Sequence, residues 1–295
     1  MLELLKSILF GIVEGITEWL PISSTGHLIL LDEFLSLDVA PNLSADFKEA
    51  YWSFFEVAIQ LGAIMAVVVL FWSKLWPFSK KKSADEKKGT WMLLFKVAFA
   101  SIPALAVGVI GDKIIEKLTS KEIEGWLYNW QTVALALAVY GVLFIFVEKI
   151  IERSGKERVA RVEDISFKDA FFVGCFQALS IIPGTSRSGS TILGARAIGF
   201  SRTAAAEFSF FMGIVAMVGA SLIKGADFAS YVVENSFSVP TLAIVALILS
   251  AAVAFAVSIA AIRFLMDFIK KHSFVPFGIY RVALAIAVAL YFVLK

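Results

Sequence analysis

The chain has 295 residues, of which 59% are hydrophobic and 18% are charged. Counting its 19 glycines as apolar raises the apolar share to about 65%, against roughly 45–50% for a soluble domain counted in the same way. This composition excludes a disordered chain, a disulfide-stapled secreted domain and an ordinary cytosolic enzyme. It predicts an all-α polytopic membrane protein.

The numbers of charged, cysteine and histidine residues exclude several kinds of partner and site. Lysine and arginine number 27 against 25 acidic residues, and no basic stripe alternates with exposed aromatic residues, so we expect no nucleic-acid partner. The single cysteine excludes an intramolecular disulfide and a thiolate metal cluster, and two histidines exclude a multi-histidine metal site. The apolar N-terminal segment carries glutamates and lacks a small-x-small cleavage site, so we expect it to be retained.

Two kinds of apolar segment are found along the chain. Residues 2–35 and 168–200 are interrupted near their middle by proline, glycine and serine. Because a lipid-facing helix cannot leave backbone groups unpaired, each is predicted to be a re-entrant helix–loop–helix hairpin whose loop is buried or lines a polar cavity. Six other segments are long enough to cross a bilayer without interruption. They are residues 51–72, 91–111, 126–148, 203–223, 239–265 and 275–294.

The charges of the connecting segments predict the orientation of the spans. Three connections are rich in lysine and arginine and are expected in the cytoplasm by the positive-inside rule. These are residues 73–90, 149–168 and 263–273. Three others are acidic or balanced and are expected outside, namely residues 32–50, 112–125 and 224–238. The first hairpin then opens outward and the second opens inward.

The two hairpins are also related in sequence. An offset of 163 aligns, without a gap, Gly11 with Gly174, Glu14 with Gln177, Ser23 with Ser186, Thr25 with Ser188, Gly26 with Gly189, Ile29 with Ile192 and Leu30 with Leu193. Each half then contains one hairpin and three spans, and an odd number of spans turns the second half upside down. We predict one membrane domain over residues 1–295, with inverted repeats at about 1–148 and 165–295, and hairpin tips that meet near the middle of the membrane.

Ionisable and hydroxyl side chains gather at the interruption of the first hairpin. Glu14 and Glu18 share one helical face. Two carboxylates inside a membrane imply a polar cavity, a cation or both, although they can also brace neighbouring helices. The following polar residues can cap a half-helix whose free amides bind an anion, and plain N-capping is the alternative. These residues are Ser23, Ser24, Thr25 and Gly26.

One histidine and one arginine complete this candidate site. His27 follows the hydroxyl residues directly. A lone histidine is more often structural, but an imidazole that titrates near neutrality can act as nucleophile, base or acid. Arg187 lies in the second interruption between Ser186 and Ser188, close to Gly189. Its planar guanidinium suits phosphate oxygens, and an ion pair with a glutamate of the first hairpin is the alternative that needs no ligand.

The combination of these residue types indicates a class of chemistry. Carboxylates suit a hard divalent cation, and arginine with helix amides suits a phosphate or diphosphate. Histidine and serine suit attack on phosphorus. Since the surroundings are apolar, a phosphate carried by a lipid could enter from the side, and the residues predict phosphoryl transfer on a lipid.

Two motifs resemble those of a known family. Residues 14–27, EGITEWLPISSTGH, are similar to an (E/Q)xxxE region followed by PxSSTGH, and residues 183–189, PGTSRSG, are similar to PGxSRSG. Residues 274–281, FVPFGIYR, also fit. The chain thus resembles, over nearly its whole length, the undecaprenyl-diphosphate phosphatases of the bacitracin-resistance (BacA/UppP) type.

The resemblance implies a multi-pass enzyme of the bacterial inner membrane whose site opens to the periplasm. Such an enzyme removes the terminal phosphate of the C55 lipid diphosphate, which returns undecaprenyl phosphate to cell-wall synthesis and confers bacitracin resistance. The resemblance also implies a divalent cation, Mg or Ca, a fold of six spans with two re-entrant hairpins in inverted repeats, and a homodimer as one form of assembly.

These inferences combine into one mechanistic hypothesis. Arg187 clamps the diphosphate, Ser24 attacks the terminal phosphorus, and His27 takes the serine proton. Glu14 and Glu18 hold the cation or orient water. The remaining expected substrate contacts are Ser23, Thr25, Gly26, Ser186, Ser188 and Gly189. His27 as the nucleophile and direct attack by water stay open.

A second class of function fits the same residues. Inverted repeats with paired broken hairpins are typical of transporters. In that interpretation the protein is a transporter or flippase of a lipid phosphate or another anion, the glutamates carry protons or cations, and Arg187 binds the passing anion. Hydrolysis that depends on His27 would separate the enzyme from the carrier, because binding alone needs no nucleophile.

Overall fold

The computed structural model describes residues 1–111, 113–114, 117, 127, 129–155 and 157–294. This part of the chain is helical, and its β-pairing is limited to an isolated bridge between Val159 and Phe200. The α-helices are α1 (Leu2–Thr17), α2 (Ser24–Leu35), α3 (Ala45–Leu70), α4 (Trp72–Leu75), α5 (Ala84–Leu105), α8 (Trp130–Ser154), α9 (Phe167–Ala178), α10 (Arg187–Ala197), α11 (Arg202–Glu234), α12 (Thr241–Ile269) and α13 (Val275–Leu294). Three short segments complete them: a π-helix at Ala106–Gly111 and 3-10 helices at Val162–Asp164 and Leu179–Ile181.

Six helices of the described residues are long and apolar enough to cross a membrane. They are α3, α5 with its π-helical extension, α8, α11, α12 and α13. The predicted class of a polytopic all-α membrane protein with six spans is therefore confirmed, although several boundaries differ. Helix α5 begins at Ala84 rather than near residue 91 because Ser83 and Glu86 form a capping box that extends the helix into its lysine-rich start.

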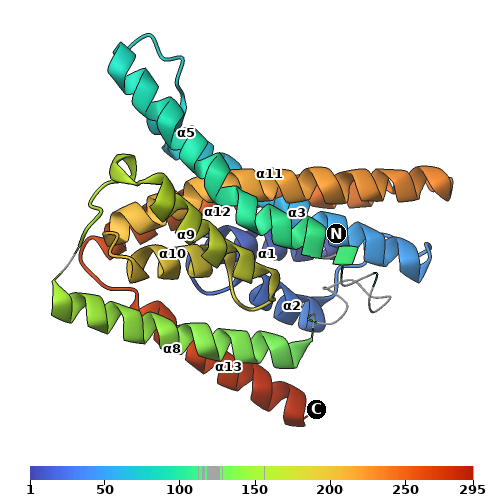
Figure 1. Cartoon of the computed structure of the whole chain (residues 1–295). Coiled ribbons are helices and arrows are strands. Elements are labelled where there is room, and N and C mark those ends of the chain that lie inside the picture. Colours follow the sequence, from blue (N-terminus) through green and yellow to red (C-terminus); the bar gives the residue numbers. More distant parts are fainter. Residues whose placement is uncertain (112, 115–116, 118–126, 128, 156, 295) are drawn as a thin grey trace.

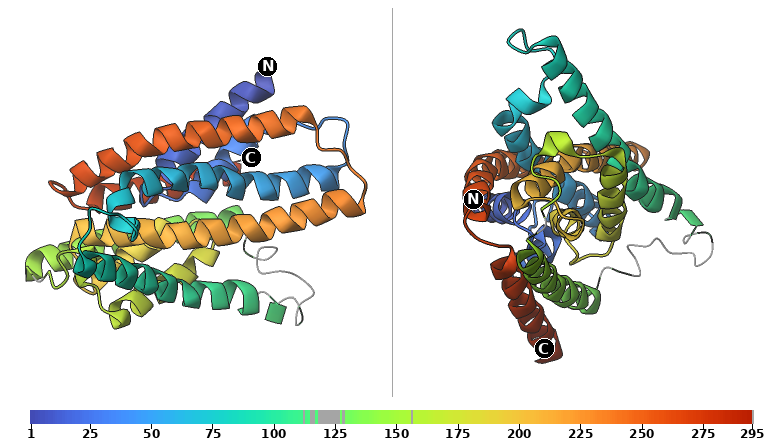
Figure 2. Two further views of the ribbon diagram at one scale, coloured as in Figure 1. Left: turned by 90° about the horizontal axis from the view of Figure 1, so that it is seen from above. Right: turned by 60° about the vertical axis from the view of Figure 1, so that its left-hand side comes forward.

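The long helices surround the two hairpins. Helices α3, α11 and α12 run side by side, and α8 packs along α13 on the opposite side of the molecule (Figures 1 and 2). The hairpins α1–α2 and α9–α10 lie between these two groups (Figure 1). Their loops are thus enclosed by protein, which is the condition for irregular backbone at membrane depth.

Each hairpin is fixed by close contact with a span from the other half of the chain. Helix α1 packs on α12, and α9 packs on α5. The second contact depends on Gly174, where a Cβ would lie 2.1 Å from the Ala100 carbonyl oxygen. A larger residue there would force the two helices apart, so glycine sets their separation. These reciprocal pairings fit an inverted repeat, and the division into two repeats and the re-entrant character of the hairpins stay predictions.

The connections between helices gather at two ends of the molecule. Those after α3, α8 and α12, which are rich in lysine and arginine, lie toward the left of Figure 1. Those after α2 and α11 lie toward the right. This grouping is the one that the loop charges predict. The predicted outer connection at 112–125 falls mostly outside the described residues.

Candidate active site

The loops at the tips of the two hairpins are built alike. Ser23 caps α2 and Ser186 caps α10, and their hydroxyl oxygens accept hydrogen bonds from Gly26 N at 3.2 Å and Gly189 N at 3.0 Å. Both serines have positive φ, 77° and 70°. Such strain costs about 1–3 kcal/mol per residue and concentrates at functional sites. Since the two glycine amides are engaged by the caps, these residues shape the loops, and their contact with substrate stays a prediction.

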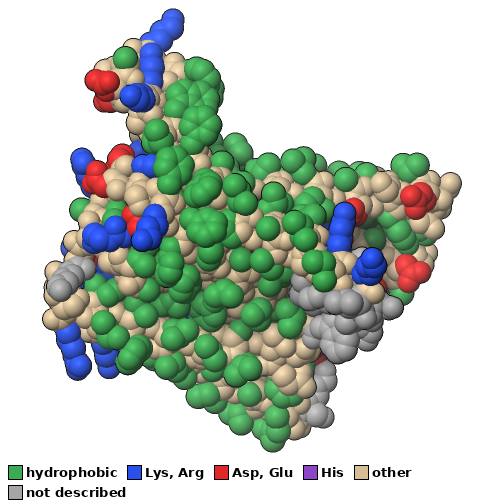
Figure 3. All heavy atoms as spheres, in the orientation of Figure 1, with side chains coloured by type: hydrophobic (Ala, Val, Ile, Leu, Met, Phe, Trp, Pro, Cys, Tyr) green, Lys and Arg blue, Asp and Glu red, His purple; other side chains and the backbone are tan. Residues whose placement is uncertain are grey.

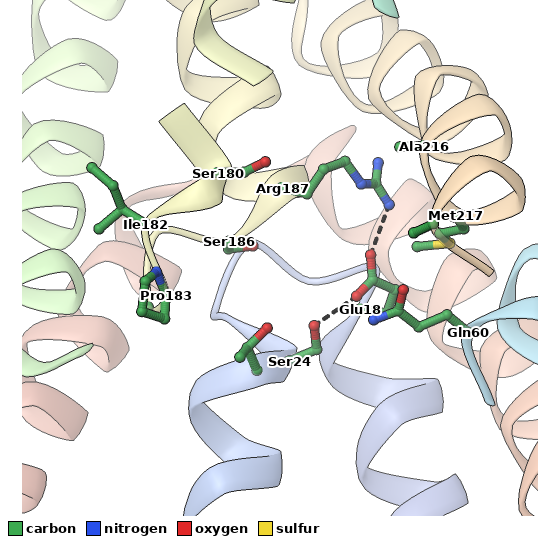
Figure 4. Close-up of a pocket in the computed structure, with 13 residues that line it drawn as sticks. Glu18, Ser24, Gln60, Ser180, Ile182, Pro183, Ser186, Arg187, Ala216 and Met217 are labelled. Atoms are coloured by element: carbon green, nitrogen blue, oxygen red, sulfur yellow. Dashed lines mark hydrogen bonds and ion pairs between the residues drawn. The ribbon is translucent and has the colours of Figure 1, made fainter. Parts of the chain in front are cut away.

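A cavity of about 260 Å³ lies where the two loops meet (Figure 4). Helices α2 and α10 both begin at its wall, so first-turn amides that have no intrahelical partner add positive potential there. The remaining wall comes from α3 and α11. The lining residues are Glu18, Ser24, Thr25, Gln60, Ser180, Ile182, Pro183, Gly184, Ser186, Arg187, Ala216, Met217 and Ala220.

A chain of hydrogen bonds crosses this cavity from one hairpin to the other. Arg187 Nη2 donates to Glu18 Oε1 at 2.8 Å, and Ser24 Oγ donates to Glu18 Oε2 at 2.6 Å (Figure 4). The side chains of Arg187 and Glu18 are only 12% and 6% exposed. The structure thus brings three of the predicted site residues together. It also contains the Arg187–glutamate ion pair that was the ligand-free alternative.

Helix α11 holds the guanidinium of Arg187 in place. Arg187 Nη1 donates to the Ser209 carbonyl oxygen at 2.6 Å. A Cβ at Gly213 would lie only 2.7 Å from Nη2, so this glycine makes room for the guanidinium. Arg187 Nε is buried and has no hydrogen-bond partner among the described residues. One donor of the fork is therefore left without a protein acceptor.

Three further hydroxyl residues of the predicted site lie at the same junction. Thr25 and Ser186 line the cavity. Ser188 Oγ donates to the Glu18 backbone oxygen at 2.9 Å and lies 3.2 Å from Ser186 Oγ. Ser188 therefore ties the start of α10 to the end of the first half-helix, while Thr25 and Ser186 face the space in which a ligand would bind.

Glu14 lies one helical turn before Glu18 and does not line the cavity. Its side chain is fully buried, and neither carboxylate oxygen has a hydrogen-bond partner among the described residues. Its charged neighbours are Glu18, Glu56 and Arg187. A buried carboxylate without a donor must be neutralised by a proton or a cation.

A divalent cation fits this environment only with help from other ligands. No group of three or more His, Cys, Asp or Glu side chains is placed to hold a metal in the described ranges. Mg²⁺ needs no such group, because it is commonly bound by one or two carboxylates together with water and substrate phosphate. Glu18 lines the cavity and could supply one such ligand, although both of its oxygens are hydrogen-bonded to Arg187 and Ser24, and Glu14 lies one turn behind the cavity wall.

His27 is not in the cavity that contains Ser24. Its Nδ1 lies 2.6 Å from the Ser23 carbonyl oxygen, which can only accept, so Nδ1 carries the proton. Its Nε2 lies 2.7 Å from the hydroxyl of Tyr280, and the two rings stack with an angle of 4°. His27 and Tyr280 line a second, mostly apolar cavity of about 490 Å³. The unprotonated nitrogen of His27 therefore contacts the hydroxyl of Tyr280 and not that of Ser24. The catalytic role of His27 stays a prediction.

Arg281 connects the two loops and was not among the predicted site residues. Its guanidinium donates to the carbonyl oxygens of Pro21 at 3.2 Å, Gly184 at 2.7 Å and Thr185 at 2.9 Å. The side chain is fully buried in α13 and packs over the Tyr140 ring. One signal could have identified it, because an arginine within an apolar span is functional by default.

Removing the guanidinium of Arg281 should loosen both loops. In Arg281→Met the three carbonyl oxygens lose their donor, and each such loss costs about 1–3 kcal/mol. Because small displacements of reacting groups can cost about 100-fold in rate, we expect a 10- to 100-fold lower kcat together with a lower Tm. Arg263→Met, at an exposed position of α12, is the matched control. Unchanged kcat and Tm in Arg281→Met would contradict this role.

The fold and the site define a polytopic membrane protein with a cavity, lined by Arg187 and Glu18, at the junction of two helical hairpins. Comparison with known proteins agrees with this class. The family model "Bacitracin resistance protein BacA" matches residues 7–287. The chain belongs to this family.

Curated relatives match the chain from end to end. The undecaprenyl-diphosphatase of Acetivibrio thermocellus is 49% identical over 292 residues, which cover 99% of this chain and 98% of the relative. The undecaprenyl-diphosphatase of Lachnoclostridium phytofermentans is 50% identical over 294 residues, covering 99% and 98%. The enzyme of the same name from Enterococcus faecalis is 50% identical over 282 residues, covering 96% and 95%.

Proposed function

We propose that the protein is an undecaprenyl-diphosphate phosphatase that hydrolyses the lipid diphosphate to undecaprenyl phosphate and phosphate. The observation that carries the proposal is the chain Arg187–Glu18–Ser24, which joins an anion-binding group, a carboxylate and a hydroxyl across one cavity. Full-length relatives that are named undecaprenyl-diphosphatases support it. Recycling of the lipid carrier for cell-wall synthesis and resistance to bacitracin follow from this activity.

The diphosphate is held at the junction of the two hairpins. Arg187 supplies the positive charge and, through Nε, a donor without a protein partner. The first turns of α2 and α10 supply amides, and Thr25 and Ser186 supply hydroxyls. The prenyl chain, which carries no polar group, remains among apolar side chains or lipid.

Ser24 is the nucleophile in this proposal, and Glu18 is its base. Ser24 Oγ attacks the terminal phosphorus while its proton passes to Glu18 Oε2, to which it is hydrogen-bonded at 2.6 Å. A bond forms between Oγ and phosphorus as the bond to the bridging oxygen breaks, and undecaprenyl phosphate leaves. Water then releases phosphate from Ser24. The role of base, which the sequence analysis gave to His27, is assigned here to Glu18 because Ser24 donates its hydrogen bond to Glu18.

A divalent cation completes the charge balance of the site. We infer that Glu14 and Glu18 hold Mg²⁺ or Ca²⁺, which would neutralise charge on the bound diphosphate. Orphaned carboxylate oxygens on Glu14 support this assignment.

The proposed setting is the bacterial inner membrane. The chain is a multi-pass membrane protein by its six apolar helices, and the positive-inside rule orients the lysine-rich connections toward the cytoplasm. The first hairpin then opens to the periplasmic side, where the substrate would enter. Assembly as a homodimer stays a prediction.

Phosphate release from undecaprenyl diphosphate by detergent-purified protein tests the activity. We expect release that is abolished by a chelator and restored by Mg²⁺ or Ca²⁺, with inorganic pyrophosphate as a substrate control. Folded protein that binds the lipid diphosphate but releases no phosphate would overturn the proposal. That outcome would instead indicate a carrier of lipid phosphates, a function for which the names of the relatives give no support.

A further inference from the structure

The hairpin that joins α3 to α5, residues 71–95, projects sideways from the helical body. In Figure 1 the start of α5 rises beyond α11 at the upper left, at the end where the lysine-rich connections gather. Figure 3 shows lysine or arginine side chains at the tip of this projection, next to hydrophobic ones. The hairpin is thus a separate surface, remote from the cavity between the α1–α2 and α9–α10 loops.

Five aromatic rings form a continuous ladder along this hairpin. Trp72 stacks on Trp76 with ring centroids 4.7 Å apart, and Trp76 meets Phe78 at 5.2 Å. Phe78 meets Trp91 at 5.6 Å, and Trp91 meets Phe95 at 6.1 Å. All five side chains are exposed, from 39% for Trp76 to 63% for Phe78. Tryptophan in such positions is typical of the boundary between lipid headgroups and acyl chains.

Lysines surround the ladder and exceed the acids nearby. Residues 73–90 hold six lysines and two carboxylates, a net charge of +4. Two lysines have structural partners: Lys74 pairs with Glu207 at 2.6 Å, and Lys82 donates to the Trp76 oxygen and to Thr90 Oγ1. The other four make no ion pair with a described carboxylate, and they are Lys80, Lys81, Lys87 and Lys88.

The order of residues along α5 indicates which part of the hairpin lies at the headgroups and which part lies at the acyl chains of a membrane. Lys87 lies one helical turn before Trp91, and Phe95 lies one turn after it. Charge, amphipathic ring and apolar ring therefore follow one another along the helix, which continues into a membrane span. This gradient matches the change from headgroup to hydrocarbon, and the surface is continuous with the lipid-facing side of α5.

We propose that the α3–α5 hairpin is a binding site for anionic phospholipid headgroups of the leaflet that it faces. The four unpaired lysines contact phosphate, and the ladder inserts at the level of the upper acyl chains. Each lysine near an anionic surface raises the binding constant about fivefold. The site depends on the membrane location of the chain and not on the proposed catalysis.

Quenching of tryptophan fluorescence by brominated lipids tests this site. The whole protein is placed in bilayers of phosphatidylcholine that contain 20% of either brominated phosphatidylglycerol or brominated phosphatidylcholine. A variant with Trp72, Trp76 and Trp91 changed to phenylalanine gives the background from the other tryptophans. We expect the ladder signal to be quenched several-fold more by the anionic lipid, and the difference to vanish at about 1 M salt, where the Debye length is about 3 Å.

Two variants that lose the same number of charges show whether the lysines of the hairpin cause the preference for anionic lipid. The substitutions Lys80→Gln, Lys81→Gln, Lys87→Gln and Lys88→Gln together should abolish the preference. The control changes four lysines elsewhere on the lysine-rich end to glutamine, namely Lys149, Lys168, Lys270 and Lys271, and should retain it. Equal quenching by both lipids in the wild-type protein, or equal loss in both variants, would overturn the proposal.

Discussion

Replacing Arg187 with alanine is expected to lower kcat/KM for the lipid diphosphate by about 10³-fold or more. The variant loses the cation that clamps the phosphate, and it leaves Glu18 buried without its partner at 2.8 Å. Arg187→Lys should recover only part of the activity, since an ammonium cannot reach Glu18 and the Ser209 carbonyl with a planar fork. Phosphate release over a range of substrate concentrations separates the effects on KM and kcat.

The space that Gly213 leaves for the Arg187 guanidinium provides a second test of the role of Arg187. A Cβ added in Gly213→Ala would lie 2.7 Å from Arg187 Nη2, so the guanidinium must move. We expect a 10- to 100-fold loss in kcat/KM from this displacement. Gly219→Ala is the matched control on the same helix, because a Cβ there meets nothing within 4 Å. Equal activities of the two alanine variants would contradict a requirement for the observed arginine position.

The spans were predictable because their signal is local. A predominantly apolar stretch of eighteen or more residues indicates a transmembrane helix. The interruptions of the two hairpins were also readable, since serine, glycine and proline within an apolar segment require a protected loop. The clustering of Glu18, Ser24 and Arg187 followed from one further assumption, that the loops of the two hairpins meet.

The partners of individual side chains were less predictable, because they depend on helices distant in sequence. His27 follows Ser24 by three residues, yet its Nε2 contacts a tyrosine 253 positions away on α13. Arg281 joins the two loops from positions 260 and 97 residues further along the chain. Nothing in the local sequence of residues 14–27 specifies that α13 passes at this point.

The assignment of Ser24 as nucleophile leads to the second large expected effect. Ser24→Ala should reduce kcat by about 10³- to 10⁴-fold, with a smaller change in KM, because the hydroxyl acts in the chemical step. Glu18→Gln should cause a loss of similar size by removing the base that Ser24 meets at 2.6 Å. Ser180→Ala is the matched control, since this serine lines the same cavity but donates to the Gln177 carbonyl oxygen.

The double variant shows whether Ser24 and Glu18 act as one unit. Glu18 also pairs with Arg187 and is a proposed ligand of the cation, so Ser24→Ala combined with Glu18→Gln should cost more than the worse single change but less than the product of the two losses. Losses that multiply in full would mean that Ser24 and Glu18 act independently. Wild-type turnover in Ser24→Ala would remove the serine from the chemistry. A phosphoryl group trapped on His27 would then assign the nucleophile to the second cavity, beside Tyr280.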